Sequence, residues 1–340
     1  MDPFCEGVPD NYKVEFLCAF AAAVRTGTYG RGHQVRCGTV QLALRSIGST
    51  CELAAKPNPT YSNQHPNSAT YWKRISQLLE GYRRADPPSQ AKLAVPVTVA
   101  HYHAQLATLS SNPKQQAISH LTNIAFYYLL RVGEYTYSGA NQKRRTTQFR
   151  VQDVIFRKGQ HIIPNTAPLQ RLLQATTATL IIDNQKNGQR GQCIHHHCTG
   201  KANSPIKSLA HRVSHIMSHT ANQATPLSTY YTPDGAVHNV LASHINQAVK
   251  SAVVLLGLSK QGFHPSRVSS HSLRAGGAMA LKLHGYDRDT IKKLGRWSSD
   301  TFLTYIHEQI SAFSAGIAET MSIPIPFHNI ESSLTVTPAA

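Results

Sequence analysis

A tight run of polar groups lies between residues 271 and 310, where the sequence reads HSLRAGGAMALKLHGYDRDTIKKLGRWSSDTFLTYIHEQI. His271 and Arg274 are three residues apart, so in a helix they share one face. Tyr305 lies on the edge of the apolar face of a further predicted helix, residues 300–310. Taken singly, His271 and Arg274 would be an ordinary surface pair, and Tyr305 would be an aromatic residue at the edge of the core. Together they gather an imidazole, a guanidinium and a phenolic hydroxyl, which are groups that bind anions and transfer protons.

Two basic residues upstream extend this set. Arg131 ends the apolar helix in YYLLRVGEYTYSG, and a cation at the end of a buried run must find an anion. Glu134, three residues later, either satisfies Arg131 structurally or holds it ready for a phosphate. Lys186 lies on the hairpin tip NQKNGQ, where it is either solvated or reaches into a groove.

Residues 1–90 are predicted to form a separate domain, a small helical bundle. Apolar residues recur with helical spacing over three stretches, residues 11–25, 38–54 and 69–84. The third stretch also has a basic face that suits either solvent or phosphates, made of Lys73, Arg74, Arg83 and Arg84. Two prolines and small residues in ADPPSQAKLAVP mark a linker near residues 85–96.

Residues 91–320 are predicted to form a mainly helical second domain with one small antiparallel sheet, so the fold class is α+β. Helical spacing recurs over residues 97–109, 115–130, 204–219 and 237–258. Strands are expected over residues 149–156, 178–183 and 192–197. Asn187 and Gly188 signal the hairpin turn between the last two strands, and Gly257 is a C-terminal cap. Residues 321–340 read as a flexible tail.

Gly276 and Gly277 lie inside the helix that begins near His271. Glycine destabilises a helix interior by about 1 kcal/mol relative to alanine, so two in a row predict that another backbone packs closely there. Asp287 is expected to cap a short helix that Gly295 ends.

The charge composition indicates which kind of binding partner to expect. The chain has 340 residues, and 34 lysines and arginines against 17 acids give a formal charge of +17. That balance favours a polyanion, either nucleic acid or an acidic membrane surface. The N-terminus has no apolar signal sequence, and the apolar run at residues 252–258 is too short to span a bilayer. We therefore expect a soluble intracellular protein, with its six cysteines as thiols.

The run CIHHHC offers zinc-ligand atoms on Cys193, His195, His197 and Cys198. Alternation along a strand puts the first three on one face and Cys198 on the other. A closed tetrahedral site would then need a distorted strand end. The simpler interpretation is a strand near DNA, and we expect no metal site.

Four motifs in this order and spacing resemble the tyrosine recombinases, also called phage-type integrases: LLRVGE, the QKNG hairpin, HSLRAGG and LGRWSSDTFLTYIHE. The resemblance is closest to the recombinases of eukaryotic mobile elements of the Crypton and DIRS-like kind, where LGRW and YI are familiar. It covers residues 94–320. The helical bundle before it resembles the core-binding, DNA-binding domain of the family more loosely.

This resemblance implies metal-free and cofactor-free phosphoryl transfer on double-stranded DNA. Tyr305 would attack the scissile phosphate to form a 3′-phosphotyrosine, which conserves the bond for rejoining. Arg131 and Arg274 would clamp the non-bridging oxygens. Lys186 would protonate the leaving 5′-oxygen, and His271 would act as a base or orienting donor. The expected function is site-specific DNA recombination or integration.

One position departs from the family pattern. The family usually has His or Trp nine residues before the nucleophile, and Arg296 stands there in this chain. Either Arg296 fills that role, or Trp297 fills it through a one-residue shift. We favour Trp297, whose indole N–H can donate to phosphate, and expect Glu134 and Arg296 to support the catalytic groups.

Two other functions are compatible with the same motifs. One is a domesticated, catalytically silent DNA-binding protein of the same fold, and the other is an enzyme resembling type IB topoisomerases. For a recombinase, the resemblance implies a monomer in free solution and a homotetramer on paired DNA sites, without a membrane. The location would be nuclear in a eukaryote and otherwise cytoplasmic.

Overall fold

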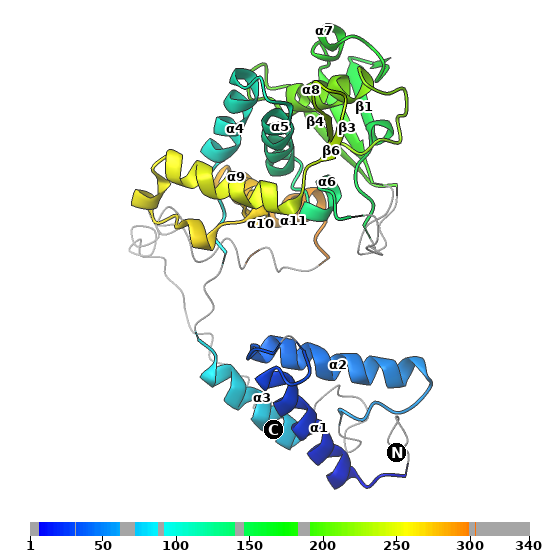
Figure 1. The fold of residues 1–340 in the computed structure, drawn as a ribbon, viewed down its shortest axis with the longest axis vertical. Helices are drawn as coiled ribbons and strands as arrows, with labels where there is room; N and C mark the ends of the chain where they lie inside the picture. The colour runs from blue at the N-terminus through cyan, green and yellow to red at the C-terminus, as the bar shows by residue number, and fades with distance from the viewer. Residues whose placement is uncertain are drawn as a thin grey trace, which may run out of the picture. The chain divides into compact units, whose positions relative to one another are not determined.

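The computed structural model describes residues 7–30, 32–61, 72–87, 92–139, 146–182, 191–298 and 303. The chain divides into two compact units, Met1–Gln90 and Ala91–Ala340 (Figure 1). The roles expected for these units stay predictions. The expected tail, residues 321–340, lies outside the described residues.

The described residues of the first unit form three helices: α1 (Asp10–Thr26), α2 (Cys37–Leu53) and α3 (Lys73–Ala85). Each buries the apolar stripe that its spacing predicts, and the stripes share one core that includes Leu17, Val40 and Ile75. Asp86 joins all three helices at their ends. Its carboxylate accepts a bond from the Cys37 N–H, 2.8 Å away, and pairs with the guanidinium of Arg25.

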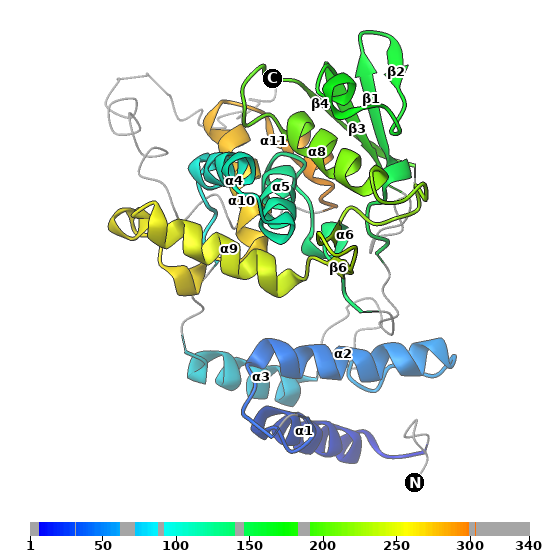
Figure 2. The same ribbon diagram turned by 45° about the horizontal axis from the view of Figure 1, so that its top comes forward.

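The second unit is built around the helix α5 (Pro113–Tyr127), which packs chiefly against four other helices (Figure 2). Those four are α4 (Val97–Leu109), α8 (Pro205–Met217), α9 (Ala242–Leu255) and α10 (Ser270–Leu283). The part of this unit that the structure describes also contains α6 (Val132–Tyr135), α7 (Leu169–Leu172), α11 (Arg288–Gly295) and the 3-10 turns η1 (Val151–Asp153), η2 (Leu258–Gln261) and η3 (Pro265–Arg267). Asp287 caps α11 as predicted, since its carboxylate accepts the Thr290 N–H. No helix in the described residues has both the length and the apolarity needed to cross a bilayer.

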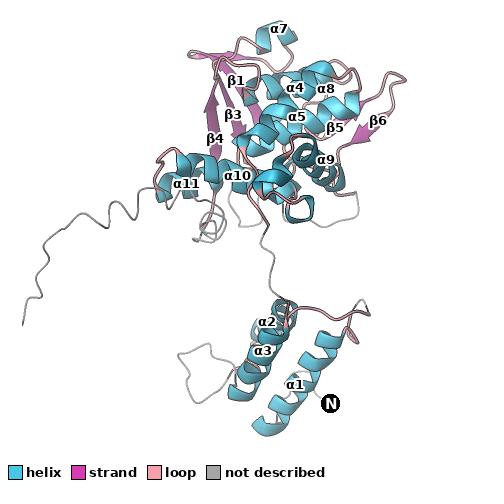
Figure 3. Ribbon diagram, turned by 90° about the vertical axis from the view of Figure 1, so that its left-hand side faces the viewer, coloured by secondary structure: helices cyan, strands magenta, loops and turns pink. Residues whose placement is uncertain are grey.

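A four-stranded antiparallel sheet lies beside these helices, in the order β2-β1-β3-β4 (Figure 3). Its strands are β1 (Val154–Lys158), β2 (His161–Ile163), β3 (Thr177–Ile181) and β4 (Cys193–His197). The predicted hairpin is confirmed, because β3 and β4 pair from Thr177–His197 to Ile181–Cys193. Its tip, residues 183–190, lies outside the described residues.

The prediction of a helix over residues 237–258 is wrong at its start. Val237–Asn239 forms the strand β6, which pairs with β5 (Thr229–Tyr231) in a second sheet, and the helix begins only at Ala242. The cause is a turn at residues 232–235, where Gly235 has φ 82° and the Thr232 N–H donates to the Ala236 carbonyl. The Pro-Asp-Gly turn signal was present in the sequence. Gly257 ends α9 with φ 64°, as predicted.

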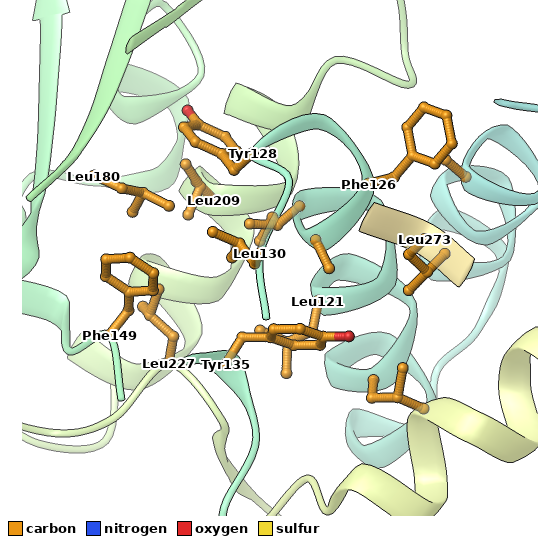
Figure 4. Packing of buried hydrophobic residues seen from close by; sticks show 14 of the residues in the cluster. Leu121, Phe126, Tyr128, Leu130, Tyr135, Phe149, Leu180, Leu209, Leu227 and Leu273 are labelled. Carbon is orange, nitrogen blue, oxygen red and sulfur yellow. The ribbon is translucent and has the colours of Figure 1, made fainter. Parts of the chain in front are cut away.

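The core of the second unit joins the end of α5 to the sheet. The ring of Tyr128 lies with Leu180 of β3 and Leu209 of α8 (Figure 4). Its hydroxyl donates to the Ala178 carbonyl at 3.1 Å. The chain that leaves α5 is therefore fixed where the site residues begin.

Close packing of α10 on α5 confirms the prediction made from Gly276 and Gly277. A Cβ at Gly276 would overlap the carbonyl oxygen of Val95, and one at Gly277 would overlap that of Phe126. The Val95 N–H also donates to the Ser272 carbonyl at 3.1 Å. The helix that carries two predicted site residues is thus set directly against the end of α5.

Candidate active site

Arg131 stands where the chain turns out of α5 and into α6. The turn begins at Leu129, a buried residue in the left-handed region with φ 50°. The Arg131 N–H then donates to Glu134 Oε2 at 2.8 Å, and its Nη1 donates to Glu134 Oε1 at 3.3 Å. The Arg131 side chain stays 24% exposed. Glu134 therefore both satisfies Arg131 and holds it at the protein surface.

Arg296 approaches the same carboxylate from the protein interior. Its Nη1 lies 3.2 Å from Glu134 Oε1, and its Nη2 lies 3.0 Å from Glu134 Oε2. Nη2 also donates to the Leu129 carbonyl at 3.1 Å. Burial lowers the pKa of Arg296, and the charge of Glu134 opposes that shift. The Arg296 side chain, only 1% exposed, is an internal partner of Glu134 in this structure.

Two arginines meet at the end of α11. Arg274, buried in the first turns of α10, donates from Nη2 to the Gly295 carbonyl. Arg131 donates from Nη2 to the next carbonyl, that of Arg296, at 3.1 Å. Adjacent peptide groups therefore orient two guanidiniums that come from distant parts of the sequence.

Trp297 covers one of these guanidiniums. Its ring lies 4.3 Å from Arg274 Cζ, within cation–π range. A reversal of the chain puts it there, because the Trp297 N–H donates to the Lys292 carbonyl and Arg296 takes φ 58°. Gly295 leaves room for the ring, since a Cβ would overlap it. The turn therefore directs the Arg296 side chain into the interior and the Trp297 side chain over Arg274.

His271 lies one turn before Arg274 on α10, with part of its side chain exposed. Partial burial lowers the pKa of His271, and the positive charge of Arg274 lowers it further. A lowered pKa keeps the imidazole neutral at pH 7, so it is able to accept a proton.

The structure thus brings together six of the predicted site residues: Arg131, Glu134, His271, Arg274, Arg296 and Trp297. Tyr305 and Lys186 lie outside the described residues. Two residues before Tyr305, Leu303 packs against a buried cluster that contains Leu129 and Ile291. The chemical roles assigned to all eight stay predictions. Sequence reasoning missed the carbonyl acceptors of Leu129 and Gly295, because a main-chain oxygen leaves no signal in residue type.

The four cations predicted to bind DNA are exposed on α3. Arg74 pairs with Glu15 at 3.3 Å, while Arg83 and Arg84 both pair with Glu80. Lys73 lines a groove of about 430 Å³ that also includes Gln41, Gln77 and Arg83. Their DNA-binding role stays a prediction.

The strand β4 separates the possible zinc ligands as alternation predicts. Cys193, His195 and His197 are exposed, and His195 Nδ1 lies 2.8 Å from the hydroxyl of Thr179. Cys198 packs against the main core. No group of three metal-ligating side chains converges among the residues that the structure describes.

No protein-family model and no curated protein matches this sequence. Solved structures do match in fold. The XerH site-specific recombinase, in a post-cleavage complex with a palindromic difH substrate, superposes with a TM-score of 0.50 over 92% of this chain and 73% of that chain. The chain has the fold of the tyrosine recombinases.

Two further tyrosine recombinases are similar at lower scores. The Tn1549 transposon integrase, in complex with transposon right-end DNA, gives a TM-score of 0.47 over 91% of this chain and 85% of that chain. A lambda integrase dimer bound to a core site gives 0.42 over 96% and 85%. Sequence identities are 14% for XerH, 12% for the Tn1549 integrase and 11% for lambda integrase. At such identities the comparison gives the tyrosine-recombinase fold, and function must be argued from the residues.

Proposed function

We propose that this chain is a site-specific DNA recombinase or integrase that cleaves and rejoins DNA through a 3′-phosphotyrosine. The observation that carries the proposal is the convergence of Arg131 and Arg274 on adjacent carbonyls at the end of α11. Two guanidiniums, those of Arg131 and Arg296, pair with the Glu134 carboxylate, and that of Arg274 lies on the neighbouring peptide carbonyl, so the cluster keeps an excess of positive charge. A phosphate is the ligand that such paired guanidiniums fit best.

In the proposed step, the Tyr305 hydroxyl attacks phosphorus and its proton passes to His271. A new bond joins the tyrosine oxygen to the 3′-phosphate, and the bond to the 5′-oxygen breaks. Lys186 gives a proton to that leaving oxygen, so charges and atoms balance. Arg131 and Arg274 stabilise the negative charge on the non-bridging oxygens, a role that elsewhere falls to a metal ion.

A suicide-substrate assay tests this function. DNA that carries the ends of the parent element, nicked beside the cleavage site, traps the covalent intermediate. We expect wild-type protein to form an adduct in excess EDTA and Tyr305→Phe to bind the DNA without forming one. DNA binding by wild-type protein without any adduct would instead support the catalytically silent alternative. Adduct formation by Tyr305→Phe would refute the choice of nucleophile.

The proposed partners are double-stranded DNA and further copies of the chain. A protomer has one Tyr305 and cuts one strand, whereas exchange between two duplexes cuts four, so we propose a monomer in solution and a homotetramer on paired sites. Kinship with Crypton and DIRS-like elements rests on the LGRW and YI motifs.

A further inference from the structure

We infer that Arg296 is a positioning residue, which holds Arg131 through Glu134 and does not itself bind the phosphate. The inference rests on the proposed function only in treating Arg131 as a phosphate ligand. The inference also decides between Arg296 and Trp297 for the family's His or Trp position. With Arg296 bound to Glu134, Trp297 is the residue that takes that role.

The Glu134 carboxylate binds two arginine residues at once. Both Glu134 oxygens accept from Arg296, at 3.2 and 3.0 Å, and the same two oxygens accept from the side chain and the N–H of Arg131. The carboxylate is fully buried. A phosphate that reached Arg296 would have to displace this bidentate pair in the interior, which leaves a buried charge without its counterion.

The backbone conformation of Arg296 also points to a structural role for its side chain. The end of α11 has the hydrogen bonds of a Schellman motif, from Trp297 N–H to the Lys292 carbonyl and from Arg296 N–H to the Lys293 carbonyl. Arg296 occupies the left-handed position of this motif, where glycine is the usual residue. A left-handed conformation is unfavourable for a non-glycine residue, because its Cβ crowds the following carbonyl oxygen. The side chain must therefore supply a compensating interaction, and the Glu134 pair is the one observed.

The Arg296 side chain also links its own turn to the turn at Leu129. Leu129 is also left-handed, with φ 50°, and its carbonyl accepts from Arg296 Nη2 at 3.1 Å. Arg131 lies two residues beyond Leu129 and returns a bond to the Arg296 carbonyl. These bonds close a loop from α11 to the end of α5 and back. Removal of the Arg296 guanidinium breaks the bonds to Leu129 and Glu134, and it leaves the bond from Arg131 to the Arg296 carbonyl in place.

Arg274 provides the internal comparison. It is held by the Gly295 carbonyl and by the ring of Trp297, neither of which involves the Arg296 side chain. A variant that lacks the Arg296 guanidinium should therefore loosen Arg131 and spare Arg274. A general loss of stability would loosen both.

The test follows arginine side-chain Nε–H signals by NMR in the full chain, with inorganic phosphate as the probe. In wild-type protein, phosphate should shift the Arg131 and Arg274 signals and leave the Arg296 signal in place. Arg296→Met keeps an unbranched, flexible side chain and removes the guanidinium with its charge. We expect its phosphate affinity to fall about tenfold and hydrogen exchange at Arg131 to quicken about tenfold, with Arg274 changed less than about twofold. Arg296→Lys, which keeps the charge, should recover part of both losses.

Val213→Ala is the matched control, since it empties a buried site in α8 without touching the cluster. If Arg296→Met does not fold, Arg296→Gly serves, because glycine accepts the left-handed turn without strain. A phosphate-induced shift of the Arg296 signal would overturn the inference. So would a change at Arg131 no larger than the change in Val213→Ala. A wild-type protein that binds phosphate as described but forms no DNA adduct would refute the proposed recombination and leave the positioning role standing.

Discussion

The guanidinium carbon of the buried Arg274 lies over the ring of Trp297, 4.3 Å from the ring centroid. Cation–π contacts of this kind contribute about 0.5–2 kcal/mol. Together with the Gly295 carbonyl, the ring fixes the plane of the guanidinium. The catalytic role predicted for Trp297, eight positions before Tyr305, would then act through Arg274 and would need no shift of the chain.

Trp297→Ala should therefore slow adduct formation by about tenfold, the rate equivalent of about 1.4 kcal/mol. Trp297→Phe should keep most of the rate, because a phenyl ring also offers a π face. The measurement is single-turnover cleavage at saturating DNA. If Phe is as slow as Ala, the indole N–H and not the ring face is the working group.

Gly276→Ala should destabilise the second unit by about 1–3 kcal/mol, because the new methyl group would overlap the Val95 carbonyl and the Phe126 ring. Gly81→Ala, in α3, is the matched control. A methyl group there meets no atom within 4 Å, so alanine should stabilise the helix of the first unit by about 0.5–1 kcal/mol. Denaturant unfolding of both variants checks the pair, and equal shifts would contradict the close packing of α10 on α5.

Acid should destabilise the second unit between about pH 6.5 and pH 4. Burial lowers the pKa of His103 to about 4, and burial likewise lowers that of His196 to about 4 despite its bond to the Tyr127 carbonyl. Between these pH values the histidines take up protons in the unfolded chain but stay neutral in the folded chain. The free energy of unfolding is therefore highest above pH 6.5 and falls as the pH drops. Each such proton contributes a slope of about 1.4 kcal/mol per pH unit. Unfolding free energies measured from pH 7.5 to 5 should fall steadily, and a flat profile would contradict the burial of these rings.

Lys186→Ala should slow cleavage of an ordinary phosphodiester far more than cleavage of one whose bridging 5′-oxygen is sulfur. A thiolate leaves without a proton because its pKa is low, which makes a general acid dispensable. Single-turnover rates on the two substrates give the comparison. Equal slowing on both would remove Lys186 from the role of acid.

Truncation after Ser311 should leave DNA binding intact and impair synapsis and strand exchange. Phe313, Ile317 and Met321 recur every four residues and would make one apolar stripe on a helix, which we propose docks on the next protomer. Sedimentation on paired sites and a recombination assay test this. Unchanged recombination would exclude an interprotomer link, and an unfolded product would assign the stripe to its own domain.

Much of the fold follows from local pattern. The apolar spacing located the helices of the first unit, and the β3–β4 hairpin follows from its strands and Asn-Gly turn, because these signals lie within a few residues of the structure that they specify. Gly276 and Gly277 even indicated a tertiary contact. The β5–β6 hairpin was missed because its helical-looking apolar spacing outweighed the Pro-Asp-Gly turn signal.

The interior of the site was less accessible to sequence reasoning. The burial of Arg296 depends on one left-handed residue and on Glu134, 162 residues earlier in the chain. No local pattern encodes such a pairing. The sequence left Arg296 and Trp297 as alternatives, whereas the structure gives them separate surroundings, one against a carboxylate and the other against Arg274.

The acceptors that orient Arg131 and Arg274 are peptide carbonyls, those of Arg296 and Gly295. A point mutation exchanges side chains and leaves these oxygens in place, so only a change in the path of the chain can remove them. Both acceptors therefore persist when residue 295 or 296 is substituted, even though Arg131 would lose the support that the Arg296 side chain gives through Glu134. Loss of the acceptors themselves should arise from insertions or deletions near the end of α11, so variants made to test the site should keep the length of this turn fixed.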